Sequence, residues 1–153
     1  MCIRDSMCGA RVGALISKNH DFMEMALKFG QARLSPPTLG QIAGEAALKT
    51  PPSYFSEVIE EYVERRDIVV DGLNKIEGVI CPKPEGAFYI LADITATGMD
   101  DIEFATRALE EAQVQVVPGS LMPGGEGLIR MSYGTSLEQI REGCKRLKNW
   151  LQD

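Results

Sequence analysis

The stretch Leu128-Ile129-Arg130-Met131-Ser132-Tyr133 decides the fold of this chain. Apolar side chains dominate it, and successive side chains of a strand point to opposite faces. The stretch therefore predicts a strand with Ile129, Met131 and Tyr133 on one face and Leu128, Arg130 and Ser132 on the other. The charged side chain of Arg130 stands in the middle of this otherwise mostly apolar strand, and the question is what its charge interacts with.

The segments around this strand predict a small α/β domain. Further strands are predicted over residues 79–81, 86–92 and 114–117. Asp100 with Glu103, and Ser136 with Gln139, have the spacing of capping boxes, so a helix is expected after each pair. The last helix carries an apolar stripe formed by Leu137, Ile140, Cys144, Leu147 and Leu151. The order strand, strand, helix, strand, strand, helix indicates helices packed on a small sheet.

The first half of the chain predicts one strand and three helices. Residues 11–17 are small or apolar almost throughout, as in a strand that is buried on both faces. The helices are predicted over residues 21–33 with Asp21 as the cap, over 38–49 with Thr38 as the cap, and over 53–76. We expect the charged face of the longest helix to be solvated and ion-paired.

The composition is that of a globular protein, with 44% hydrophobic and 25% charged residues in a chain of 153. The net charge of −6 argues against nucleic acid as the main partner, because phosphate binding uses a basic face. No apolar run approaches the roughly 20 residues that cross a bilayer, so no membrane association is expected. No signal peptide is visible either, and we expect a cytoplasmic location.

The cysteines and the single histidine predict no metal site. Cys2, Cys8, Cys81 and Cys144 form no Cys-x-x-Cys pair, and His20 is the only histidine. Zinc sites use closely spaced ligand pairs, so we expect buried free thiols in a reducing compartment instead. His20 has no obvious serine or cysteine nucleophile beside it and is expected at the surface.

Two arginines are candidates for anion binding. Arg130 is costly to bury unpaired, so its guanidinium must reach solvent, an internal carboxylate or the carboxylate of a ligand. Arg11 lies between Gly9 and Gly13, where it could hold a phosphate or stand exposed on a tight turn. The residues alone leave these alternatives open. The glycine-rich segment 119–127 lacks the Walker and dinucleotide patterns and is expected to be a connecting loop.

Six stretches form an ordered set along the chain. They are Ser6-Met7-Cys8-Gly9-Ala10-Arg11-Val12-Gly13, Ser35-Pro36-Pro37-Thr38-Leu39-Gly40-Gln41, Tyr62-Val63-Glu64-Arg65-Arg66-Asp67, Pro84-Glu85-Gly86-Ala87-Phe88-Tyr89, Val117-Pro118-Gly119-Ser120 and Gly127-Leu128-Ile129-Arg130-Met131-Ser132. Together they resemble the class I/II aminotransferase family of fold-type-I pyridoxal phosphate enzymes, aspartate-aminotransferase-like. The resemblance runs from about residue 6 to the C-terminus and corresponds to the C-terminal portion of such an enzyme.

The resemblance implies an α/β fold made of three parts. Residues 1–50 would be a remnant of the large domain that binds pyridoxal phosphate. Residues 51–77 would be the long interdomain helix, and residues 78–153 the small C-terminal α/β domain.

The resemblance also implies a cofactor, substrates and residue roles. The cofactor would be pyridoxal 5'-phosphate, with Arg11 holding its phosphate. Arg130 would bind the α-carboxylate of the substrate, and Phe88 and Tyr89 would lie near it. The substrates would be an amino acid and a 2-oxo acid, and the full-length protein would be a homodimer.

Two positions depart from the family pattern, and the first is Cys2, which stands where a serine is usual. The place of the Schiff-base lysine holds Ile3, which has no amine and cannot form an imine. We therefore expect no catalytic residue in this chain and no activity from the chain alone. The simplest interpretation is that residues 1–5 replace native sequence.

The resulting hypothesis is a fragment of an aminotransferase that moves an amino group between an α-amino acid and a 2-oxo acid. One alternative is another fold-type-I reaction, such as that of a C–S lyase or a decarboxylase, because fold alone does not choose the chemistry. The other alternative is a non-catalytic module that binds carboxylates or a partner.

Overall fold

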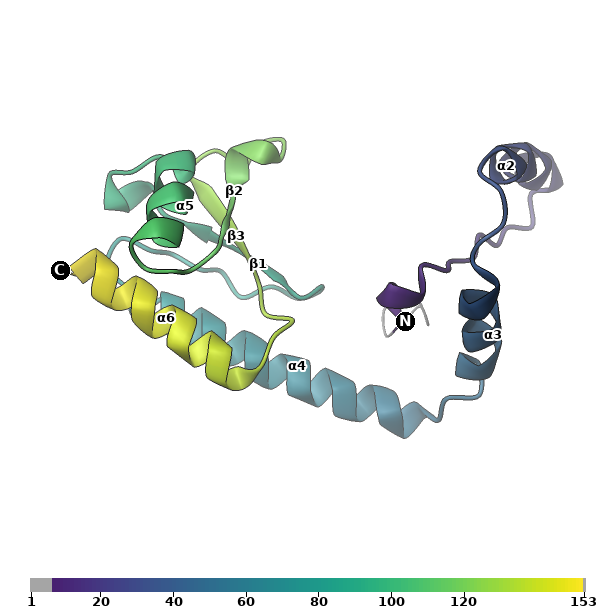
Figure 1. Cartoon of the computed structure of the whole chain (residues 1–153), viewed down its shortest axis with the longest axis horizontal. Helices are drawn as coiled ribbons and strands as arrows, with labels where there is room; N and C mark the ends of the chain where they lie inside the picture. The colour runs from purple at the N-terminus through teal and green to yellow at the C-terminus, as the bar shows by residue number, and fades with distance from the viewer. Residues whose placement is uncertain (1–6, 153) are drawn as a thin grey trace. The chain divides into compact units, whose positions relative to one another are not determined.

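The computed structural model describes residues 7–152 and divides the chain into two compact units, Met1–Tyr54 and Phe55–Asp153 (Figure 1). We call them unit 1 and unit 2. The boundary falls in the first turn of the long helix α4 (Pro52–Leu73). None of the helices formed by the described residues has both the length and the apolar character needed to cross a membrane.

Unit 1 consists of short helical elements joined by extended chain. The 3-10 helix η1 (Cys8–Ala10) is followed by α2 (His20–Ala32) and α3 (Thr38–Ala47). In α3, Gly40 lies against the preceding segment, since a Cβ there would stand 2.6 Å from the carbonyl oxygen of Ala10. The two predicted helices are thus present, within a few residues of their predicted ends.

The predicted caps of these two helices are wrong. The side chain of Asn19 caps α2 by accepting a hydrogen bond from the Phe22 amide at 3.0 Å, and Asp21 lies inside the first turn. Pro37 occupies the N-cap position of α3 without a side-chain hydrogen bond, so Thr38 is the first helical residue instead of the cap. The fixed φ of proline favours the extended conformation that an N-cap adopts.

The strand predicted over residues 11–17 is also wrong. These residues form no strand, and Ile16 is 91% exposed. A strand requires a neighbouring strand to pair its backbone groups, and unit 1 has no strand among its described residues. These residues are apolar as a buried strand would be, but the described residues of unit 1 form no sheet with which they could pair.

Helix α4 starts one residue before its predicted beginning and ends three residues before its predicted end. Only its C-terminal part is buried, through Val69, Val70 and Leu73. Beyond it, the Asn74 side chain accepts a hydrogen bond from the Cys81 amide at 2.8 Å and donates one to the Cys81 carbonyl at 2.9 Å. Because Cys81 uses its backbone groups in this way, the predicted strand over 79–81 is reduced to one bridge, between Ile80 and Asp93.

The sheet of unit 2 has three antiparallel strands in the order β1-β3-β2. They are β1 (Tyr89–Asp93), β2 (Val117–Pro118) and β3 (Leu128–Ser132). The strand predicted over 128–133 is confirmed to within one residue. The strands predicted over 86–92 and 114–117 begin three residues later than expected, because β3 offers partners only from Tyr89 and Val117 onward.

The helices of unit 2 are positioned by their predicted caps. Asp100 accepts a hydrogen bond from the Glu103 amide at 2.7 Å and starts α5 (Asp101–Glu110). Ser136 accepts one from the Gln139 amide at 3.2 Å and precedes α6 (Leu137–Gln152). Between these elements lie the 3-10 helices η2 (Thr95–Thr97) and η3 (Gly119–Leu121).

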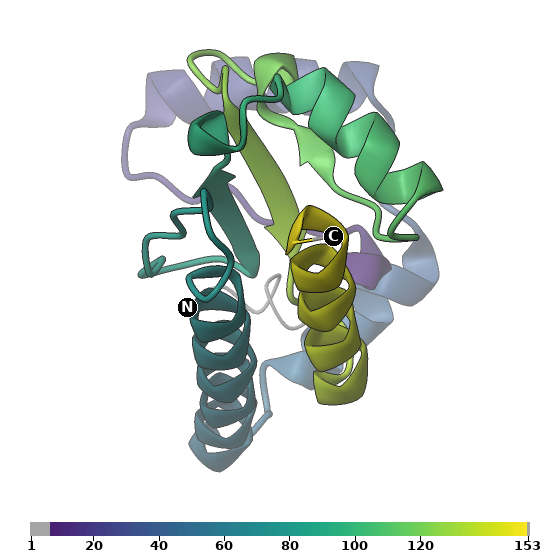
Figure 2. The same cartoon turned by 90° about the vertical axis from the view of Figure 1, so that its left-hand side faces the viewer.

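A single apolar core joins the sheet to α4, α5 and α6. Helix α6 runs beside the C-terminal part of α4 (Figure 2), and Gly72 permits the contact, since a Cβ there would stand 2.7 Å from the Cys144 sulfur. The deepest side chains of the core are Leu73, Ile90, Ile94, Phe104, Ile129 and Leu147. The core therefore covers one face of the sheet, the face of Ile90 and Ile129.

Candidate functional site

Arg130 lies at the centre of the sheet of unit 2. Its direct cross-strand partners are Leu91 on β1 and Val117 on β2. Residues paired in this way share a face, and this face is the one opposite the core. Leu91 is 43% exposed, while its neighbours on the other face are fully buried. The half-buried arginine thus stands on an open, largely apolar face of the sheet.

The guanidinium of Arg130 is flanked by two uncharged groups. Its Cζ lies 5.0 Å from the centroid of the Tyr89 ring, and its Nη1 lies 3.8 Å from the sulfur of Met122. Within residues 7–152 no carboxylate lies within salt-bridge distance of it. Of the predicted alternatives for Arg130, an internal salt bridge is therefore not found in the described part of the chain.

Phe88 is one step removed from Arg130. Its ring packs against Tyr89 at 4.7 Å between centroids and against Tyr62 of α4 at 6.2 Å. The resemblance places both Phe88 and Tyr89 near the substrate, and of the two it is Tyr89 that contacts Arg130 directly. The register explains why, because Tyr89 pairs with Ser132 and is the diagonal neighbour of Arg130.

Met122 reaches Arg130 from the loop that enters β3. The amide of Met122 donates to the Gly119 carbonyl at 2.7 Å, and its own carbonyl accepts from the Gly125 amide at 3.1 Å. Gly119 and Gly125 touch through their backbones, since a Cβ on Gly119 would come 1.9 Å from the Gly125 oxygen. The predicted connecting loop is therefore a closely packed one, and it places a thioether on the arginine.

A buried carboxylate holds this loop. Asp101, at the start of α5, is 5% exposed and accepts a hydrogen bond from the Ser120 amide at 2.8 Å. Hydrogen bonding to Ser120 is the main reason that the pKa of Asp101 lies below its ordinary value. The sequence predicts no role for Asp101, since Asp100 already provides the acidic cap at the start of this helix.

Arg11 lies in unit 1 with a left-handed backbone, at φ 53°. Its exposed side chain lines an open hollow of about 920 Å³ together with Arg33, Gly13, Gln31 and Ser35, among others. Two guanidinium groups thus border one hollow. His20, exposed at the start of α2, does not line it.

The remaining candidate groups contribute no further site. Within residues 7–152 no group of three or more metal-ligating side chains is present. Cys81 and Cys144 are buried free thiols, and burial raises the pKa of Cys81 to about 11. A thiol with so high a pKa is a poor nucleophile. Cys2 and Ile3 lie outside the described residues.

Comparisons with known proteins identify the fold. No family model matches the chain. It is 37% identical to an aspartate aminotransferase of Rhizobium meliloti (strain 1021) over 152 residues, covering 93% of this chain and 37% of that protein. It is 35% identical to an aspartate aminotransferase of Pyrococcus horikoshii over 150 residues, covering 96% and 38%.

Solved structures agree with these relatives. The aspartate aminotransferase from Thermotoga maritima matches with a TM-score of 0.81 and 35% identity, over 97% of this chain and 37% of that one. The alanine aminotransferase from Pyrococcus furiosus matches with a TM-score of 0.79 and 32% identity, over 88% and 35%. The chain belongs to the class I/II aminotransferase family. The family and the fold class predicted from the sequence are thereby confirmed.

The chain corresponds to only part of an aminotransferase, and its residues fit only part of the cofactor. It spans only 37–38% of the length of the two curated relatives above. The family implies pyridoxal 5'-phosphate, and the residues of unit 1 fit only the phosphate end of this cofactor. The hollow beside Arg11 provides guanidinium groups for an anion, but none of the described residues that line it is a lysine.

Proposed function

We propose that this chain contributes the substrate-binding part of an aminotransferase, which moves an amino group between an α-amino acid and a 2-oxo acid. The observation that carries the proposal is the Arg130 guanidinium, held on the open face of the sheet beside Tyr89 with no carboxylate partner in the described chain. A half-buried charge of this kind is stabilised by an anion, and its planar fork suits a carboxylate.

In this proposal each residue of the site has a separate task. Arg130 binds the substrate carboxylate and fixes the orientation of the Cα atom. Phe88 supports the site through the ring of Tyr89, which it contacts at 4.7 Å. Arg11 holds the cofactor phosphate in unit 1. When bound, pyridoxal 5'-phosphate supplies an electron sink for the reaction at Cα.

The names of the relatives support an aminotransferase over the alternatives. They include aspartate, aspartate/prephenate and N-acetyl-LL-diaminopimelate aminotransferases, and no C–S lyase or decarboxylase is among the named relatives. The same names differ in substrate, so they do not select an amino acid. A homodimer for the complete protein and a cytoplasmic location stay predictions.

Carboxylate binding to the full chain tests the site. We expect 4-methyl-2-oxopentanoate to shift the amide resonances of β1 and β3 saturably. Replacing Arg130 with glutamine should weaken this binding by about tenfold or more, since a charge-assisted hydrogen bond contributes about 1.5–3 kcal/mol. The matched control is Arg141→Gln, which removes the same charge from an exposed position on α6. Equal loss in both variants, or loss in neither, contradicts the proposal.

We also propose that the chain alone is inactive. Ile3 stands where the resemblance expects the lysine, and the lining of the Arg11 hollow includes no lysine among residues 7–152. With pyridoxal phosphate, an amino acid and a 2-oxo acid present, we therefore expect no transamination. Borohydride reduction followed by peptide mapping should find no cofactor on residue 3. Robust turnover by the purified chain would refute this part of the proposal.

A further inference from the structure

We propose that Tyr89 is a positioning residue for Arg130, because its ring orients the guanidinium without neutralising it and leaves the N–H donors to a substrate carboxylate. The aromatic ring performs this task, and the phenol hydroxyl is not needed for it. This inference rests on the proposed function of Arg130 and adds to it a residue that prepares the arginine before the substrate binds.

The register of the sheet places the Tyr89 ring beside the guanidinium. Tyr89 pairs with Ser132 and Leu91 pairs with Arg130, so Tyr89 and Arg130 are diagonal neighbours on the same face. A diagonal neighbour lies within reach of an aromatic or long side chain. The Cζ of Arg130 lies 5.0 Å from the centroid of the ring. This separation is inside the range of about 6 Å over which a ring attracts a cation.

The Tyr89 ring is itself fixed by other rings. Phe88 packs against it at 4.7 Å between centroids, and Phe88 in turn contacts Tyr62 of α4 at 6.2 Å. Tyr62 also contacts Tyr133, whose hydroxyl donates a hydrogen bond to the Ala87 carbonyl at 2.5 Å. The surface that Tyr89 offers to the arginine is therefore anchored to α4 through a chain of aromatic contacts.

The ring attracts the guanidinium without using its hydrogen-bond donors. The attraction comes from the negative face of the ring, whereas a carboxylate partner would bind N–H groups and cancel the charge. The Nη1 of Arg130 donates to the Met122 sulfur at 3.8 Å, and a thioether is a weak acceptor. Within residues 7–152 no carboxylate lies within salt-bridge distance to compete for these donors. The arginine is thus oriented and still charged.

Orientation before binding matters because an arginine side chain is long and has many rotamers. A ligand that fixes such a side chain must overcome the loss of its conformational freedom. A guanidinium that the ring already restricts loses less freedom when the carboxylate binds, so the carboxylate binds more tightly. Loss of the ring should therefore weaken binding, but by less than loss of the arginine itself.

Binding of 4-methyl-2-oxopentanoate to the full chain, followed by titration of amide resonances, tests the role of the ring. This acid has a single carboxylate, so the titration reports one charged contact. We expect Tyr89→Leu to raise the dissociation constant about two- to fivefold, the scale of a cation–π contact at an exposed site. Tyr89→Phe keeps the ring and should bind like the parent chain. Equal weakening in Tyr89→Phe and Tyr89→Leu overturns the role of the ring.

Tyr89→Glu tests whether the guanidinium must stay without a compensating charge. A carboxylate in place of the ring takes the donors of Arg130 and cancels its charge, so it should weaken binding more than Tyr89→Leu does. Binding to Tyr89→Glu that equals or exceeds binding to Tyr89→Leu contradicts this part of the inference.

The Nε–Hε resonance of Arg130 in the ligand-free chain reports the orientation directly. It is assigned by its disappearance in Arg130→Gln. In Tyr89→Leu we expect it to lose the shift that a nearby ring produces, and its order parameter should fall. Tyr89→Phe should restore both values. A purely structural role of Tyr89 would instead lower the free energy of unfolding and leave this order parameter unchanged, and that result overturns the inference.

The outcomes separate this inference from the proposed function. Binding that is lost in Arg130→Gln and unchanged in Tyr89→Leu overturns the inference and leaves the function standing. Binding that does not depend on Arg130, or no binding at all, overturns both.

Discussion

Asp101 is the only buried charged side chain among the described residues, and it links the start of α5 to the loop of Met122. Its pKa lies below the ordinary value near 3.8 because Ser120 donates hydrogen bonds to the carboxylate. A group whose pKa is lower in the folded state stabilises the fold above its unfolded pKa. That stabilisation is lost as the pH falls through the folded pKa.

We therefore predict a pH-dependent difference between the parent chain and Asp101→Asn. The free energy of unfolding by urea should be higher for the parent at neutral pH, and the difference should shrink below about pH 4. Asp71→Asn, at an exposed position on α4, is the matched control and should change little at any pH. A difference that stays constant from neutral pH to about pH 3 would show that the charge of Asp101 does not stabilise this loop.

At the scale of single elements, the helices were predictable because their signals are local. The caps at Asp100 and Ser136 were recognised from spacing alone, and both hold in the structure. The caps of α2 and α3 were misassigned by one or two residues. In α2, Asn19 offers the same chemistry as Asp21 just upstream, so a pattern of residue types could not separate them.

The strands were less predictable, because a strand exists only where a partner accepts it. Residues 11–17 have strand composition but no strand beside them among the described residues of unit 1, and Cys81 bonds its backbone groups to the Asn74 side chain. The short strand β2 starts at Val117, where pairing with Arg130 begins. Each of these errors concerns pairing over a distance in the chain, which local composition does not record.

In the candidate site, too, the local features were predictable and the long-range contacts were not. The position of Arg130 on a strand face opposite to Ile129 followed from the period of two. Its contacts with Tyr89 and Met122 depend on the register of β1 and on a loop closed by two glycines. The resemblance suggests Tyr89 near the substrate, but its direct contact with Arg130 follows only from that register.

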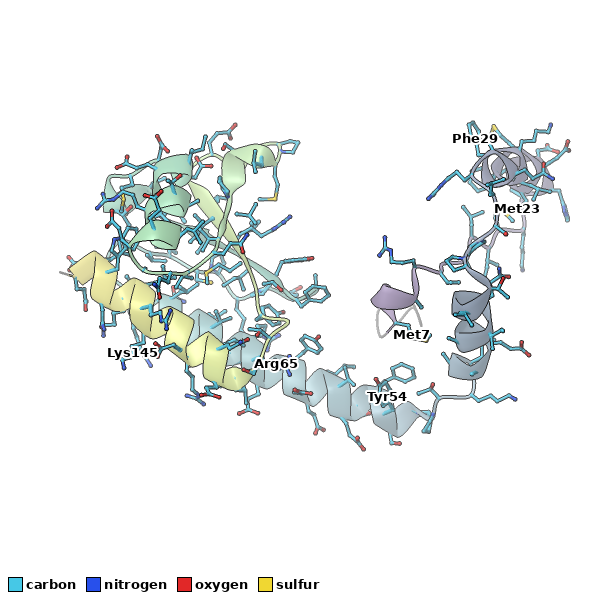
Figure 3. The ribbon with its side chains drawn as sticks, in the orientation of Figure 1. Met7, Met23, Phe29, Tyr54, Arg65 and Lys145 are labelled. Atoms are coloured by element: carbon cyan, nitrogen blue, oxygen red, sulfur yellow. The ribbon has the colours of Figure 1, made fainter. Side chains whose placement is uncertain are left out.

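At the scale of the whole molecule, the two units differ in how much they bury. Every buried apolar side chain among the described residues belongs to unit 2, between Val69 and Leu147. Helix α2 buries no residue, and Phe29, labelled in Figure 3, is 70% exposed. Tertiary packing supplies most of the stability of helices in proteins, so the two units should not be equally stable.

Hydrogen exchange on the full chain measures this difference directly. We predict slow exchange for amides of β1, β3 and α6, whose side chains pack in the core, and fast exchange for amides of α2. A helix of 13 residues without buried side chains is marginal in water, because its packing does not offset the cost of nucleation. The ratio of protection factors should exceed about a hundredfold, since local opening ranges from nearly no cost up to the global free energy of unfolding. Repeating the measurement at several protein concentrations controls for association through the apolar residues of α2, which would slow exchange as concentration rises. Protection of α2 equal to that of α6 at every concentration would contradict the prediction and show that unit 1 is as stable as unit 2.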